Sequence, residues 1–297
     1  MMRFGLKHLK PSARGLLGIN GRNLELVYTH NPRGNFPNID NKLRCKAMLA
    51  SHEIPTPLTY RVITGPRTLR GWEDDVSEVS AFVIKPARGF GGGGIMVLNR
   101  CESGWSVSSG EMLSSSDIEF HVKQILNGAF SIDNISDIAF FEEKLENHPA
   151  IEALINPEAG GVADIRIIYQ FNRPVMAMLR LPTKESDGKA NLHQGGLGVG
   201  IDIDSGMTTG GCQRNDVITH HPETGIALSG HQMPDWRKLL DFGARIAEVV
   251  QLGYIGVDFV IDPRRGPLVL EVNARPGLNI QIANQCGLRG RVQWSYE

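Results

Sequence analysis

The chain has 297 residues, with 31 Lys and Arg against 32 Asp and Glu, which gives a formal net charge of -1 at pH 7. This balance provides no global basic field and argues against bulk binding of nucleic acid. Hydrophobic residues make up 41% of the chain and charged residues 21%, as in folded globular proteins. At this length we expect two domains or one large domain.

Neither the cysteines nor the N-terminus indicates export or a zinc ribbon. The four cysteines form no C-x-x-C pair, so we expect neither a zinc ribbon nor a disulfide framework. The basic N-terminus lacks the apolar core of a signal peptide. The best apolar run, residues 242–261, contains Arg245, Glu248 and Asp258 and is too charged for a membrane span. We therefore expect a cytoplasmic protein.

The first half of the chain begins with turn signals and continues as a mixture of helices and strands. Pairs such as Asn20-Gly21 and Asn31-Pro32 predict an irregular leader over residues 1–40. A helix is predicted from Asp40, its N-cap, to Leu49. The remaining elements are strands at 58–63, 81–85 and 95–98, a Ser/Gly-rich loop at 103–116, and a helix at 117–126 capped by Asp117.

The second half contains strong hairpin signals. Strands at 165–169 and 175–179 flank one turn, and strands at 254–261 and 268–272 flank another. A polar, glycine-rich loop is predicted at 184–200, where such loops often carry function. An amphipathic helix is predicted at 235–251. Hairpins without βαβ units indicate an α+β fold.

A run of glycines, Gly89 to Gly94, connects two predicted strands. It matches G-x-G-x-x-G, but a strand follows it and not the helix that a dinucleotide fingerprint requires. Glycines allow backbone N–H groups to approach anionic oxygens closely, and Lys85 could add a positive charge beside them. The run therefore predicts a phosphate-binding loop, with a flexible turn beside a surface lysine as the alternative.

The last predicted hairpin carries two carboxylates. If Asp262 pairs with Pro267, Asp258 lies opposite Glu271, and Asn273 follows on the same face. Facing carboxylates repel unless a cation lies between them, and an all-oxygen ligand set favours Mg²⁺ or Mn²⁺. An exposed sheet face with ordinary acids is the alternative.

Several short motifs stand in an order that is similar to a known family. They are Asp40-Asn41-Lys42, Val83-Ile84-Lys85-Pro86, the glycine run, and segments 141–144, 164–166, 178–180, 191–196, 256–258 and 270–277. Together they resemble the ATP-grasp superfamily and, within it, the α-L-glutamate ligase-like branch. The resemblance covers most of residues 38–285.

This resemblance implies an α+β ATP-grasp fold of two subdomains with ATP bound between them. The expected divisions are a leader at 1–40, an N-terminal subdomain with the glycine loop at 41–141, and a C-terminal subdomain with the metal site at 142–297. The implied nucleotide-binding residues are Lys42, Lys85, Gly89, Gly91, Gly92, Gly93, Glu142, Glu143 and Lys144. The implied Mg²⁺ or Mn²⁺ ligands are Asp258, Glu271 and Asn273. The residues expected near the transferred phosphate or the acyl group are Arg166, Arg180, Asn191 and Arg275.

The resemblance also implies an activity. It indicates an ATP-dependent carboxylate–amine ligase that acts through an acyl phosphate, with glutamate as a candidate substrate and an amino acid, peptide or protein as the acceptor. One alternative is a phosphotransferase with a hydroxyl or histidine acceptor, and another is a nucleotide-binding protein without turnover. Many glutamate ligases of this superfamily carry an N-terminal α/β domain where this sequence has a short leader, so the acceptor cannot be carried over. For Arg180, an ion pair with Asp164 is the structural alternative.

Overall fold

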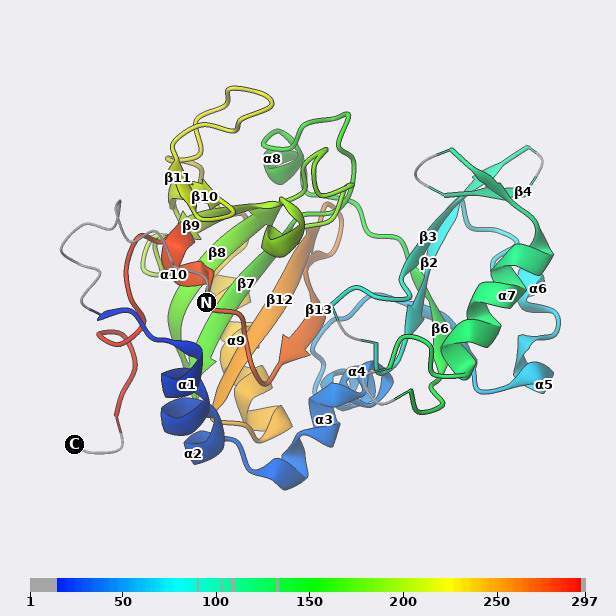
Figure 1. Cartoon of the computed structure of the whole chain (residues 1–297), viewed down its shortest axis with the longest axis horizontal. Coiled ribbons are helices and arrows are strands. Elements are labelled where there is room, and N and C mark those ends of the chain that lie inside the picture. The colour runs from blue at the N-terminus through cyan, green and yellow to red at the C-terminus, as the bar shows by residue number, and fades with distance from the viewer. Residues whose placement is uncertain (1–14, 90, 103, 108–109, 132–133, 295–297) are drawn as a thin grey trace. The chain divides into compact units, whose positions relative to one another are not determined.

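The computed structural model describes residues 15–89, 91–102, 104–107, 110–131 and 134–294. The chain divides into two compact units (Figure 1). Unit 1 takes its described residues from 1–39, 44–56 and 146–297, and unit 2 comprises 40–43 and 57–145. The expected domain boundary between residues 141 and 142 falls inside a strand of unit 2.

Unit 2 is built on a six-stranded sheet in the order β1-β6-β2-β3-β4-β5, with antiparallel neighbours. Its strands are β1 Thr59–Ile63, β2 Ala81–Pro86, β3 Met96–Cys101, β4 Gly104–Ser106, β5 Met112–Leu113 and β6 Ala139–Glu143. Its helices are α5 Pro66–Leu69, α6 Trp72–Asp75 and α7 Ser115–Leu126. The rings of Trp72, Phe82 and Phe141 pack against one another in its core. Such aromatic clusters bury a large apolar area in a small unit.

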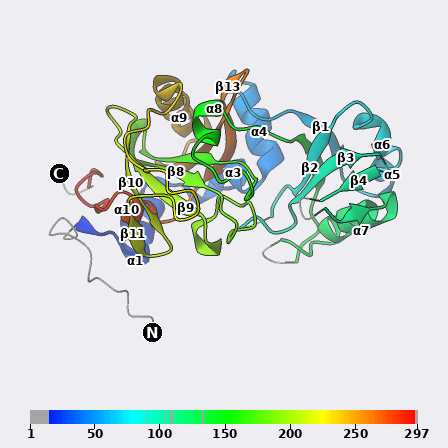
Figure 2. The same ribbon diagram turned by 90° about the horizontal axis from the view of Figure 1, so that it is seen from above.

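Unit 1 is built on a seven-stranded antiparallel sheet in the order β11-β10-β9-β8-β7-β12-β13. The strands are β7 Asp164–Gln170, β8 Arg173–Leu181, β9 Leu197–Ile201, β10 Thr208–Gln213, β11 Asp216–Ile218, β12 Tyr254–Asp262 and β13 Gly266–Asn273. The helices are α8 Pro149–Glu152, α9 Trp236–Val250 and α10 Ile280–Ala283. In Figure 2, α9 and α10 are seen on opposite sides of this sheet.

Helix α9 lies close to its sheet because Gly243 has no side chain. A Cβ atom at Gly243 would come within 2.1 Å of the Tyr169 ring. Tyr169 is fully buried, and its hydroxyl donates to the carbonyl oxygen of Leu239 at 3.2 Å. The apolar face of α9 therefore covers one face of the sheet. The side chains on the opposite face of the sheet do not pack against α9.

Most of the segment predicted as an irregular leader is helical where the structure describes it, so the prediction of irregular structure is wrong for those residues. Residues 19–30 form α1 Ile19–Gly21, a π-helical segment Arg22–Val27 and α2 Tyr28–His30. Leu26 and Val27 are fully buried in the core of unit 1. Packing of these side chains outweighs the local turn signal of Asn20-Gly21. A 3₁₀ turn Arg33–Asn35, α3 Pro37–Asp40 and α4 Lys42–Ala50 follow.

Other predicted bounds change for local reasons. The stretch 103–116 contains β4 and β5, and the predicted loop 184–200 ends in β9. Helix α7 is capped by Ser114, whose hydroxyl accepts from the backbone N–H of Asp117, so Asp117 belongs to the first turn. Asp40 is the last residue of α3, and α4 begins at Lys42. Among the described residues, no helix is long and apolar enough to cross a membrane.

Candidate functional site

The β12–β13 hairpin places Asp258 opposite Glu271, as predicted, although the assumed register is wrong by one residue. Asp262 pairs with Gly266 and not with Pro267. A β-bulge between Asp258 and Phe259 then restores the facing pair of carboxylates. Asn273 lies opposite Gly256 and on the same face, where its Nδ2 donates to Asp258 Oδ2 at 3.3 Å.

Four charged residues from three neighbouring strands share this face. Arg166 on β7 is the cross-strand neighbour of Asp258 on β12, and Asp164 on β7 is the neighbour of Arg180 on β8. Side chains alternate between faces along a strand, so the face that carries Arg166 is opposite to the one that carries Tyr169 and packs on α9. The site therefore lies on the sheet face away from α9.

Two guanidinium groups surround Asp258. Arg166 makes a bidentate contact, with Nε 2.7 Å from Oδ1 and Nη2 2.6 Å from Oδ2. Arg180 bridges two acids, with Nε 2.5 Å from Asp164 Oδ1 and Nη2 2.8 Å from Asp258 Oδ2. The Arg180–Asp164 ion pair that the sequence offered as an alternative is therefore present. Each guanidinium also has N–H groups beyond the two used here.

Burial and charge act in opposite directions on the two acids. Burial would raise the pKa of Asp258, but Arg166 and Arg180 outweigh it and hold that pKa below its ordinary value. Burial and the neighbouring charge of Asp258 raise the pKa of Asp164 to about 6, against the opposing effect of Arg180. Asp258 is therefore the carboxylate that stays ionised, and it is 1% exposed.

The donor atoms on this face fit a hard divalent cation. Asp258 and Glu271 carry carboxylate oxygens on this face, and Asn273 carries an amide oxygen as well as the Nδ2 that donates to Asp258. Asp258 Oδ1 accepts one hydrogen bond from Arg166 and keeps a lone pair. In the part of the chain that the structure describes, no group of three or more His, Cys, Asp or Glu could hold a metal ion. A cation here would thus rely on two carboxylates and one amide.

Asn191 and Arg275, the other two predicted catalytic residues, make contacts elsewhere. Asn191 Oδ1 accepts from the backbone N–H of His193 at 3.0 Å and caps the 3₁₀ turn Leu192–Gln194. The guanidinium of Arg275 is exposed and lies over the ring of Phe36, 4.7 Å from its centroid. The structure thus brings Arg166 and Arg180 to Asp258, and it shows Asn191 and Arg275 in other interactions.

In unit 2, the start of the glycine loop is tied to its surroundings. Lys42 Nζ donates to the carbonyl oxygen of Gly89 at 2.8 Å, and the Lys42 backbone N–H donates to Ala87. Asp137 accepts from the backbone N–H of Arg88 at 2.9 Å. Lys42 was predicted from the sequence, but Asp137 was not, because nothing local distinguishes it from a loop acid.

The far end of the loop is also tied. The carbonyl oxygen of Gly94 accepts from His121 Nε2 on α7 at 2.9 Å. Gly94 has φ +75°, and a Cβ there would come within 2.7 Å of the Phe130 ring. Gly91 and Gly92 also have positive φ, but open space surrounds them. Hydrogen bonds thus hold both ends of the loop, and the backbone N–H groups of Gly91 and Gly92 lie between them. Phe90 lies outside the described residues.

Lys85 and Glu142 form a buried ion pair between β2 and β6. The two side chains are 12% and 4% exposed, so each neutralises a charge that would otherwise be costly. Glu143 Oε1 accepts from the backbone N–H of Leu58 at 2.6 Å, and Lys144 Nζ donates to Asn99 at 2.7 Å. The four residues predicted for nucleotide binding in this region therefore lie along and just after the central strands of unit 2.

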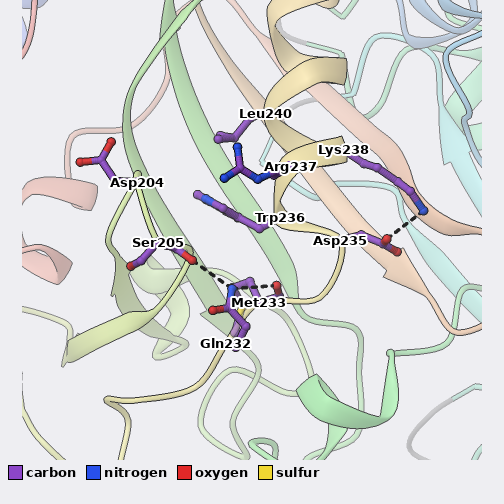
Figure 3. Close-up of a pocket in the computed structure, with 9 residues that line it drawn as sticks. All are labelled: Asp204, Ser205, Gln232, Met233, Asp235, Trp236, Arg237, Lys238 and Leu240. Carbon is purple, nitrogen blue, oxygen red and sulfur yellow. Dashed lines mark hydrogen bonds and ion pairs between the residues drawn. The ribbon is translucent and has the colours of Figure 1, made fainter.

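A separate pocket of about 410 Å³ lies in unit 1 at the start of α9 (Figure 3). Asp235 and Lys238 form an ion pair of 2.8 Å at its edge, and Trp236 lies in its wall. None of the residues predicted for nucleotide, metal or catalysis lines it. The lining residues are Asp204, Ser205, Gln232, Met233, Asp235, Trp236, Arg237, Lys238 and Leu240.

Comparison with known families adds to this geometry. Residues 21–295 match the family described as sugar-transfer associated ATP-grasp. The chain belongs to this ATP-grasp family. The match confirms the predicted superfamily and the α+β fold, but it does not confirm the glutamate ligase-like branch. A search of curated proteins gave no match.

Similar solved structures include other ATP-grasp proteins. The ATP-grasp ligase PsnB, complexed with a minimal precursor, has 17% identity and a TM-score of 0.43, over 84% of this chain and 56% of PsnB. A D-alanine–D-alanine ligase from Bacillus anthracis has 10% identity and a TM-score of 0.47, over 84% of this chain and 60% of the ligase. D-Cycloserine synthetase DcsG has 14% identity and a TM-score of 0.47, over 86% of this chain and 70% of the synthetase. The chain spans little more than half the length of PsnB.

Proposed function

We propose that this ATP-grasp protein is an ATP-dependent ligase that joins a carboxylate to an amine through an acyl phosphate. The observation that supports this most directly is the shared sheet face that carries Asp258, Glu271 and Asn273 beside Arg166 and Arg180. This face combines oxygen donors for a cation with guanidinium groups for an anion. Such a combination suits phosphoryl transfer to a carboxylate.

The proposed roles follow the chemistry of each group. Asp258, Glu271 and Asn273 would hold Mg²⁺ or Mn²⁺, which when bound neutralises charge on the phosphates of ATP. Arg166 and Arg180 would use their further N–H groups for the transferred phosphoryl group and the acyl oxygen, because the planar fork matches both anions. Asn191 and Arg275 remain proposed contacts of the transferred phosphate or the acyl group, because the family resemblance implies those positions. Nucleotide binding is assigned to Lys42, Lys85, Gly89, Gly91, Gly92, Gly93, Glu142, Glu143 and Lys144.

The proposed reaction balances without a protein nucleophile. A carboxylate oxygen attacks the γ-phosphorus of ATP, the bond from that phosphorus to the bridging oxygen breaks, and ADP leaves. An amine then attacks the carbonyl carbon of the acyl phosphate, a C–N bond forms, inorganic phosphate leaves, and the amine loses a proton to solvent. The protein therefore has to orient two anions and an amine and stabilise the developing charge.

The acceptor and donor classes are part of the proposal. Amino acids and peptides remain the candidate amines, with glutamate as a candidate carboxylate. The family's description as sugar-transfer associated adds sugar acids and amino sugars to the panel. A cytoplasmic location also remains a prediction.

The test is ADP formation measured against a panel of these acids, with and without amines, and with mass spectrometry of the products. A ligase gives an amide only when the acid and the amine are both present. Hydroxylamine in place of the amine should trap the acyl phosphate as a hydroxamate. A phosphorylated alcohol or histidine that forms without any amine would instead identify a phosphotransferase.

A further inference from the structure

The helix formed by residues 19–30 shows apolar side chains to solvent. Ile19, Leu24 and Tyr28 are 63%, 64% and 51% exposed, whereas Leu26 and Val27 on its inner side are fully buried. In Figure 1 this blue helix and the red C-terminal segment lie on the same side of unit 1. These exposed apolar side chains stand among polar ones on a helix that Leu26 and Val27 anchor, and they are available to contact a second surface.

The hairpin turn between β7 and β8 extends this apolar area. Phe171 is 48% exposed, and its ring centroid lies 5.1 Å from that of His30, the last residue of α2. Arg173, the first residue of β8, donates to the carbonyl oxygen of Arg291 at 2.5 Å. The helix, the turn and the C-terminal segment thus form one continuous area, which we call the N-terminal surface. Its members are Ile19, Leu24, Tyr28, Phe171, Arg173, Arg289 and Arg291.

The charge on and beside the N-terminal surface is mainly positive. Arg289 and Arg291 are exposed, and so is Arg173. Glu25 forms an ion pair of 3.3 Å with Arg289, and the charge of Arg291 is one of the causes that lower the pKa of Asp202. Arg22 on the same helix is half-buried and adds a further positive charge.

We propose that the N-terminal surface docks on an anionic lipid bilayer, a property that does not depend on the proposed ligase activity. Exposed aliphatic and aromatic side chains on a convex helix can enter the interface between headgroups and acyl chains, while arginines beside them meet lipid phosphates. Tyr28 suits such an interface because its ring is apolar and its hydroxyl is polar. Nucleic acid would use the arginines but would leave Ile19 and Leu24 in water.

The test is cosedimentation of the full chain with vesicles at low salt. We expect binding to vesicles of phosphatidylcholine with phosphatidylserine and little binding to phosphatidylcholine alone. Raising the salt should weaken binding, since exposed charges are screened. Arg291→Gln should lower the partition coefficient about fivefold, and the double change Leu24→Ser with Tyr28→Ser should lower it about tenfold or more.

Matched controls lie on unit 2. Phe120→Ser removes an aromatic side chain that is 64% exposed, and Arg67→Gln removes an exposed arginine. Both controls should bind as the unchanged protein does, and circular dichroism should show that every variant is folded. The proposal is overturned if the unchanged protein does not bind the phosphatidylserine vesicles, or if the controls lose as much binding as the surface variants. It is also overturned if Leu24→Ser with Tyr28→Ser converts a dimer to a monomer without changing vesicle binding.

Discussion

At Asp258 the protein buries a carboxylate and places two guanidinium groups against it. An ionised acid at 1% exposure is costly unless it is paired and hydrogen-bonded, and Arg166 and Arg180 satisfy that requirement. The same contacts fix both guanidinium planes, so their remaining N–H groups are oriented before an anion arrives. Such preorganisation is what stabilises charge that develops in a transition state.

Arg180→Lys tests this role because it keeps the charge and removes the fork. A lysine cannot bridge Asp164 and Asp258 and also reach a phosphoryl group. We expect turnover to fall more than tenfold, about 1.4 kcal/mol or more of transition-state stabilisation, while ADP affinity barely changes. The measurements are steady-state kinetics and ADP titration by calorimetry.

The control for Arg180→Lys is Arg265→Lys, which changes an ion pair with Asp262 at the far end of the same hairpin. Arg265→Lys should leave turnover unchanged. If Arg180→Lys lowers only the free energy of unfolding, with normal activity per folded molecule, the guanidinium is purely structural.

Glu271→Gln tests the cation site. The change keeps the size of the side chain and removes its charge, so it should lower turnover at least tenfold and raise the Mg²⁺ concentration needed for half-maximal activity. The exposed Glu248→Gln on α9 is the matched control. Full turnover of Glu271→Gln at an unchanged Mg²⁺ requirement would exclude this carboxylate as a ligand.

At the scale of elements, the glycine loop is tied to α7 through the hydrogen bond from His121 to the carbonyl oxygen of Gly94. His121→Phe removes the donor to Gly94, whereas His121→Gln can keep one. If the loop binds ATP phosphates, His121→Phe should raise the KM for ATP about fivefold with a smaller effect on kcat, the usual contribution of one hydrogen bond. His121→Gln should recover most of the affinity. Equal KM values in the two variants would show that this contact does not position the loop.

The hairpins and the helix α9 could be predicted from the sequence because their patterns are local. Alternating apolar residues and turn signals identify β7, β8, β12 and β13, and apolar periodicity identifies α9. The bulge at Asp258 could not be predicted, because it depends on how β12 fits between β7 and β13. The correct facing of Asp258 and Glu271 thus came from an incorrect register.

The residues of the site divide in the same way. Asp258, Glu271 and Asn273 are close in sequence and share a hairpin, so counting along two strands could bring them together. Asp137 and His121 act on the glycine loop from segments more than twenty residues away, and their contacts exist only in the folded unit. The helix at 19–30 was missed because buried side chains stabilise it and its local signals favour a turn.

At the scale of the whole molecule, each unit contains a histidine, buried in unit 1 and half-buried in unit 2, whose pKa lies below its ordinary value. In unit 1, burial lowers the pKa of His221, which Glu223 partly opposes. Its Nδ1 accepts from the backbone N–H of Glu223 at 3.2 Å, and its Nε2 has no partner in the described part of the chain. In unit 2, burial lowers the pKa of His121, against the hydrogen bond to Gly94. Both side chains are therefore neutral in the folded protein at pH 7.

These two histidines predict a loss of stability in mild acid. In the unfolded chain each of these histidines takes up a proton near pH 6.5, whereas in the folded chain it stays neutral to lower pH. The contribution of each histidine to the free energy of unfolding is therefore full above pH 6.5, and it is lost as the pH falls through the lowered pKa. The raised pKa of Asp164, about 6, has the opposite effect, because it increases the free energy of unfolding as the pH falls below that value. The pH profile of the unchanged protein therefore contains both effects.

Single variants separate the two effects: His221→Gln and His121→Gln should each lose less free energy of unfolding between pH 7.5 and 5.5 than the unchanged protein, measured by urea denaturation. The exposed His52→Gln is the control and should lose as much as the unchanged protein does. If all three variants follow the unchanged protein over this range, His221 and His121 are not the groups that couple stability to pH.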